Sequence, residues 1–135
     1  VTMAKSWEKY GIHALETVYP IVGPGFESIQ NIGDKNHNIV HLKHSKGIDI
    51  NIANINDMLG GFGLISLMGT KSGIQIKSTD TYYAFKKQLQ SYVNYLQTGH
   101  KPVPWNETYE LMQLVSAGIE SREKDGMKIT LNKDK

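Results

Sequence analysis

The segment 40–52 constrains the fold more strongly than any other part of the chain. Apolar and polar residues alternate along 40–43 and again along 48–52, and Ser45-Lys46-Gly47 separates the two runs. Side chains alternate between the two faces of a strand, so each run has one apolar face and one polar face. The pattern predicts a β-hairpin within an antiparallel sheet that is covered on one side only.

The remaining elements predicted from the sequence are strands first and helices later. Strands are expected at 26–32, 64–68, 74–76 and 127–131. Helices are expected at 11–19 with Pro20 as the stop, from a cap at Thr79 or Asp80 to Gly99, and from a cap at Asn106 to 124–126. Strands with segregated helices predict an α+β domain, in which helices pack on one face of an open, mostly antiparallel sheet.

The other face of such a sheet is expected to serve association. If that face carries apolar residues, a second molecule or another domain must cover it. We therefore expect a homo-oligomer formed through the sheet face.

Size and composition indicate a single domain over residues 1–135. A net charge of +2 without a basic run argues against nucleic acid as a partner, and no apolar run is long enough to span a membrane. The absence of cysteine fits a cytoplasmic location. The chain begins with Val1 and runs directly into structured sequence, which indicates a piece of a longer protein.

Three further patterns argue against other chemistries. Gly60-Gly61-Phe62-Gly63 leads into a strand rather than a helix, so no cofactor site is expected in this chain. His41 and His44 lie three apart in a strand and face opposite sides, so these two and His37 are interpreted as solvated residues, with no metal site. Aromatic residues recur at helical spacing and are interpreted as core packing rather than as a base-stacking surface: Tyr82, Tyr83, Phe85, Tyr92 and Tyr95.

His13 is the residue best suited to take part in a reaction. It is placed at the start of the first predicted helix, beside Gly11, and Trp7, Lys9 and Tyr10 lie just upstream, where they could line a polar pocket. Histidine exchanges protons near neutral pH. Considered alone, His13 is either a proton-transfer residue or a structural one.

Several segments together resemble the C-terminal domain of the glucose–fructose oxidoreductase/inositol dehydrogenase (Gfo/Idh/MocA) family. Residues 10–16 resemble the Gly-x-His helix start of that family. The other similar segments are 23–28, 92–99 with Pro102-Val103-Pro104, 107–112 and 117–121. Their order and spacing cover nearly the whole chain.

The resemblance implies the substrate-binding and oligomerisation domain of a two-domain NAD(P)-dependent oxidoreductase. The N-terminal Rossmann domain, which would bind NAD or NADP, is absent from these 135 residues, and the fragment alone is expected to be inactive. By similarity, His13 would transfer the proton of a sugar or polyol hydroxyl.

One position departs from the family pattern. Many members carry aspartate four residues before the histidine, where this chain has Lys9. A charged lysine cannot accept a proton, so Lys9 indicates an altered substrate, such as an anionic one, or a loss of activity.

The alternative is a non-enzymatic binding or dimerisation module of the same fold, in which His13 merely caps its helix.

Overall fold

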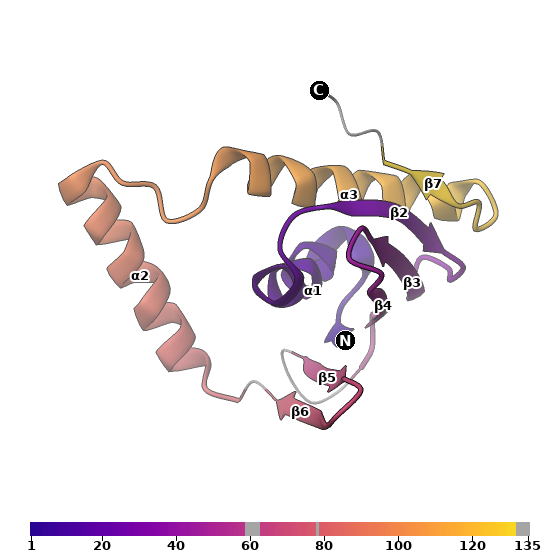
Figure 1. Cartoon of the computed structure of the whole chain (residues 1–135), viewed down its shortest axis with the longest axis horizontal. Helices are drawn as coiled ribbons and strands as arrows, with labels where there is room; N and C mark the ends of the chain where they lie inside the picture. The colour runs from indigo at the N-terminus through magenta and orange to yellow at the C-terminus, as the bar shows by residue number, and fades with distance from the viewer. Residues whose placement is uncertain (59–62, 78, 132–135) are drawn as a thin grey trace.

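The computed structural model describes residues 1–58, 63–77 and 79–131, which form the predicted α+β fold (Figure 1). The helices are α1 (Trp7–Val22), α2 (Thr81–Thr98) and α3 (Trp105–Glu123). The strands are β1 (Thr2–Ala4), β2 (Phe26–Asn31), β3 (His37–His44), β4 (Asp49–Ile55), β5 (Leu64–Met68), β6 (Gly73–Lys77) and β7 (Ile129–Thr130). Of the predicted glycine-rich turn, residues 60–62 lie outside the described residues.

The described strands form one open sheet in the order β6-β5-β1-β4-β3-β2-β7. The predicted hairpin is confirmed as β3 and β4, with Val40 opposite Ile52 and Leu42 opposite Ile50. All pairs of neighbours are antiparallel except β1 and β4, which are parallel. Strand β1 was not predicted, because three residues are too few to reveal a period of two.

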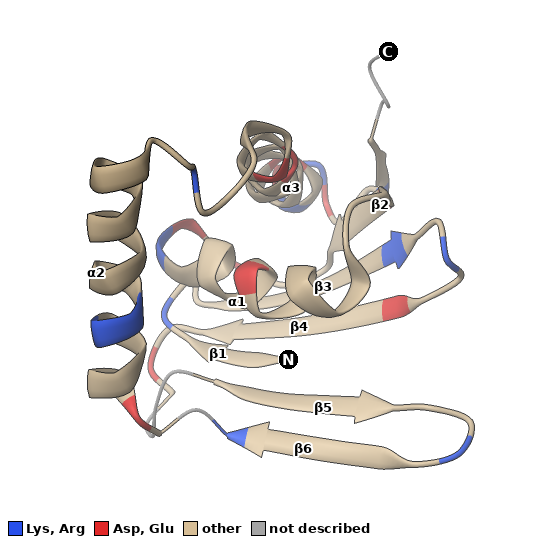
Figure 2. Ribbon diagram, turned by 60° about the vertical axis from the view of Figure 1, so that its left-hand side comes forward, with Lys and Arg blue, Asp and Glu red and all other residues tan. Residues whose placement is uncertain are grey.

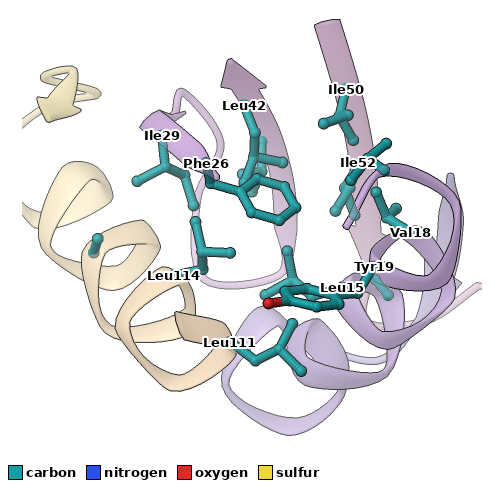
Figure 3. Packing of buried hydrophobic residues seen from close by; sticks show 14 of the residues in the cluster. Leu15, Val18, Tyr19, Phe26, Ile29, Leu42, Ile50, Ile52, Leu111 and Leu114 are labelled. Carbon is teal, nitrogen blue, oxygen red and sulfur yellow. The ribbon is translucent and has the colours of Figure 1, made fainter. Parts of the chain in front are cut away.

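Helices α1 and α3 cover one face of the sheet, as expected from the alternating strands (Figure 2). The core lies between these helices and strands β2, β3 and β4, where apolar side chains of both layers meet (Figure 3). Its largest fully buried apolar side chains are Trp7, Phe26, Met3, Leu15, Ile29, Leu42, Ile52 and Leu114. Each such side chain contributes about 1.5–3 kcal/mol by leaving water, so this layer holds the domain together.

Helix α1 is longer than predicted at both ends. It begins at Trp7, whose side chain is buried, and it passes through Pro20 to Val22. The prediction that Pro20 ends the helix is wrong, because proline already has a helical φ and removes only one hydrogen bond here. Burial of Val22 favours the extra residues, and Gly23 then ends the helix with a φ of 77°.

The caps of the later helices were predicted with mixed success. Asp80 caps α2 as expected, with its Oδ1 accepting from the backbone N–H of Tyr83 at 2.8 Å. Gly99 ends that helix in the left-handed region. Asn106 does not cap α3: the helix already begins at Trp105, and Pro104 occupies the cap position.

Helix α2 contradicts the prediction that its aromatic residues pack in the core. None of its residues is buried, and it stands at the edge of the molecule in Figures 1 and 2. Tyr82, Tyr83, Phe85 and Tyr92 are exposed, and Tyr95 is half-buried. The helical period was correct, but the surface that would bury the stripe is not among the described elements.

The uncovered face of the sheet is polar across β3 and β4. Asp49 Oδ1 lies 3.2 Å from His41 Nε2 and 2.5 Å from Lys43 Nζ. His41 Nδ1 also lies 2.9 Å from the side-chain oxygen of Asn51. Ile39 of β3 adds an exposed apolar side chain to these polar groups. The face therefore offers both charge and apolar area to a partner.

A carboxylate on α3 links this helix to α1 and to the sheet. Glu110 accepts hydrogen bonds from the backbone N–H groups of Gly25 and Phe26 at 2.9 and 3.0 Å, and from the hydroxyl of Tyr19 at 2.8 Å. Each hydrogen bond to a charged group contributes about 1.5–3 kcal/mol. Glu110 thus ties α3 to the end of α1 and the start of β2.

The Tyr19 hydroxyl should make stability fall at alkaline pH. Burial, followed by the hydrogen bond and charge of Glu110, raises the pKa of Tyr19. The stability contributed by the neutral hydroxyl is therefore fully present below the unfolded-state pKa of about 10 and is lost as the pH rises above it. Urea unfolding should show this loss in the wild type, but not in Tyr19→Phe.

The matched control for that measurement is Tyr82→Phe on α2. Tyr82 is exposed, so its replacement should leave the alkaline loss of stability as large as in the wild type. An equal loss in Tyr19→Phe would contradict the assignment to Tyr19.

Candidate active site

His13 lies on α1, and its side chain is partly exposed. The helix begins at Trp7, so His13 occupies the second turn rather than the first turn predicted from the sequence. Its side chain is 45% exposed, and the ring of Tyr10 meets it edge-on at 5.1 Å between centroids. The structure thus brings together two of the predicted site residues, one turn apart on the same helix.

A carboxylate that the sequence did not assign lies beside His13. Glu16 Oε2 is 2.9 Å from His13 Nδ1. A carboxylate only accepts hydrogen bonds, so Nδ1 carries the hydrogen of this contact, and in the neutral ring Nε2 is then the basic nitrogen. The signal was present in the sequence, because residues three apart on a helix are neighbours.

Lys9 lies four residues before His13 and is exposed. Residues four apart share one side of a helix, so Lys9, His13 and Glu16 all belong to the same side of α1. This side combines a cation, an imidazole and a carboxylate, and the ring of Tyr10 contacts the imidazole. These groups suit a small, oxygen-rich ligand, which needs several hydrogen-bond donors and acceptors.

Trp7 is in the core rather than at this surface. Its side chain is 0% exposed, and its Nε1 donates to the backbone oxygen of Val115 at 2.9 Å. The indole lies between Gly11 and Gly118, where a Cβ atom would come within 2.7 and 2.6 Å of it, respectively. A residue with no exposed surface cannot contact a substrate, so the prediction that Trp7 lines a pocket is wrong. It instead supports the helix that carries His13.

The other histidines of the hairpin lie on opposite faces of the sheet, as predicted. His37 and His41 lie on exposed parts of β3, beside Asp34 and Asp49, respectively. His44 is buried, contrary to the prediction of a solvated residue, because its ring packs edge-on against Phe26. Across the described ranges, no cluster of three potential ligands could hold a metal ion.

Among the described elements, no junction between a strand and a helix has the glycines of a dinucleotide phosphate site. A strand leads into a helix at 5–6 and at 78–80, and neither junction contains glycine. A dinucleotide site of the Rossmann type needs glycines there, so that the backbone can approach the pyrophosphate. The two junctions therefore lack the phosphate-binding signature of a Rossmann domain. In the described part of the chain, no helix is both long and apolar enough to cross a membrane.

The described elements form an open-sheet α+β domain, and several solved oxidoreductase structures have the same fold. No protein-family model and no curated protein matches the chain, but solved structures share its fold. One is myo-inositol dehydrogenase from Lactobacillus casei in complex with NAD(H) and myo-inositol. It superposes with a TM-score of 0.78 and 14% identity, over 99% of this chain and 53% of that one.

Two further solved structures share the fold of this chain. A myo-inositol dehydrogenase from Corynebacterium glutamicum has a TM-score of 0.74 and 18% identity, over 98% of this chain and 54% of its own. GenD2 from gentamicin A biosynthesis, in complex with NAD, has a TM-score of 0.75 and 14% identity, over 97% and 54%. The present chain therefore spans about half the length of the structures it matches.

Proposed function

We propose that the chain is the substrate-binding and oligomerisation domain of an NAD(P)-dependent oxidoreductase that acts on a sugar, a polyol or a related hydroxy compound. The observation that carries this proposal is the match of nearly the whole chain to about half of two inositol dehydrogenases and of GenD2. The partly exposed His13, with Glu16 at its Nδ1, supplies a proton acceptor on that fold.

His13 is the proposed proton-transfer residue. Oxidation of an alcohol removes a hydride from carbon and a proton from oxygen. NAD(P), held by the other domain, would supply the hydride acceptor. His13 Nε2 would take the hydroxyl proton, while Glu16 holds the ring through Nδ1 and stabilises the imidazolium that forms. Glu16 thereby takes the place of the carboxylate that is missing at Lys9.

Lys9 and Tyr10 are the proposed substrate-binding residues. Tyr10 offers a hydroxyl one turn before His13, and Lys9 offers three N–H donors on the same side of the helix. An ammonium group favours an anionic substrate over a neutral polyol. We therefore place an acidic sugar or a phosphorylated hydroxy compound before inositol itself.

Two measurements test the proposed function. The coding sequence upstream of Val1 should encode a glycine-rich βαβ unit and a Glu-Lys-Pro segment, and the two-domain protein should bind NADH or NADPH in titration calorimetry. The 135-residue chain alone should bind neither. An upstream sequence without that unit would favour a non-enzymatic binding module, and tight dinucleotide binding by the chain alone would also contradict the proposal.

The uncovered sheet face is the proposed surface for self-association. His41, Lys43 and Asp49 place both signs of charge on it, so two copies related by a two-fold axis can pair opposite charges. Sedimentation equilibrium should show a dimer or larger assembly. The variant Ile39→Asp should weaken it, because this adds a charge to exposed apolar area. A wild-type protein that stays monomeric at high concentration would exclude this surface.

A further inference from the structure

Helix α2 has an apolar stripe that nothing in the described structure buries. Its members recur at spacings of three and four residues: Tyr82, Phe85, Leu89, Tyr92, Val93 and Leu96. All six are exposed, whereas α1 and α3 each bury an apolar face against the sheet. A shallow hollow runs along the helix from Tyr82 to Gln97. An uncovered stripe of this size marks an interaction surface.

The composition of α2 is typical of a helix that is buried in an interface. Four of its 18 residues are tyrosine and one is phenylalanine, while Lys86 and Lys87 are its only charged residues. Aromatic enrichment with few charges is typical of the buried centre of an interface. A helix that stays in water would carry a broader polar surface.

Charge argues against a second α2 as the occupant. Helix α2 has two lysines and no acidic residue, so two such helices side by side would bring like charges together. Eighteen residues make about two and a half heptads, fewer than the three or four that indicate a coiled coil. Two convex helices would also meet along one line and leave much of the stripe in water.

We propose that this stripe is the docking surface for the dinucleotide-binding half of the parent enzyme. This inference rests on the proposed function. It is supported by the coverage, because the chain spans only 53–56% of five solved structures that share its fold. A domain on the same chain has a high effective concentration, so a contact of modest area suffices. The contact sets the position of the cofactor domain relative to α1 and His13.

Hydrogen exchange in the two-domain protein tests this contact. The amides of α2 should exchange at least about tenfold more slowly in the two-domain protein than in the 135-residue chain. The reason is that the contact with the other domain must break before the helix can unfold locally. Leu89→Lys should abolish the difference and lower turnover. The matched control, Ala84→Lys, adds the same charge at an exposed position off the stripe and should change neither quantity.

The outcomes separate this inference from the proposed function. The two-domain protein could bind NADH and convert substrate while the amides of α2 exchange equally fast in both proteins and Leu89→Lys behaves like Ala84→Lys. In that case the proposed docking surface is wrong and the proposed function stands. If the exchange of α2 in the isolated chain slows as its concentration rises, a second copy is the occupant and the inference is overturned. If the two-domain protein binds no dinucleotide, the proposed function itself fails.

Discussion

Replacing His13 with alanine should lower the turnover of the two-domain enzyme by about 10²- to 10⁴-fold, which is the usual contribution of a positioned proton acceptor. The dissociation constant of NADH should stay the same, because the described part of the chain offers no glycine-containing junction for a dinucleotide. Steady-state kinetics with titration of NADH measures both quantities. Unchanged turnover would remove His13 from the mechanism.

The substitution Glu16→Gln should lower turnover less than His13→Ala does. The amide retains an oxygen that can accept from His13 Nδ1, but it removes the negative charge. The pair is about half exposed, so its charge contributes about 0.2–1 kcal/mol and turnover should fall by no more than about fivefold. A loss as large as that of His13→Ala would instead make Glu16 a direct participant in the reaction.

Trp7→Ala should destabilise the folded chain by about 3–5 kcal/mol, because it empties the space between α1 and α3 and leaves the backbone oxygen of Val115 without its donor. Urea unfolding of the 135-residue chain measures this loss. The matched control is Trp105→Ala on α3. Its side chain is 70% exposed, and its ring contacts Lys101 Nζ, which lies 4.4 Å from the ring centroid, so the free energy of unfolding should change by no more than about 1 kcal/mol.

Equal effects of the two tryptophan substitutions would contradict the placement of Trp7. A small effect of Trp7→Ala together with weakened substrate binding would restore the original prediction that Trp7 lines the pocket. The expected result, a large loss of stability, assigns Trp7 to the support of α1.

The sequence predicted best what depends on a period of two. The hairpin β3–β4 and strands β5 and β6 follow from alternation and glycine turns. Strand β5 has the predicted bounds and β6 is one residue longer at each end, whereas β3 begins three residues earlier and β4 ends three residues later than predicted. Strand β1 was missed because its place is set by pairing with β4, a partner about 50 residues away. No local pattern can reveal such a pairing.

The helices show why burial is harder to predict than period. The stripes of α1 and α2 look alike in sequence, but one meets the sheet and the other meets nothing described here. In the same way, spacing identified His13 but not the burial of Trp7 six residues earlier. Whether an aromatic residue lines a pocket or fills a core depends on Gly11 and Gly118, and Gly118 lies more than 100 residues away.

The short strand β1 also determines how the hairpin β5–β6 is held in the domain. Among the described residues, the hairpin β5–β6 joins the rest of the sheet only through β1, at the pairing of Thr2 with Leu64. Met3, the next residue of β1, is itself buried in the core. Loss of the first four residues would therefore remove a core side chain and also release the hairpin from the sheet. The first residues of the chain thus connect the outer hairpin to the core.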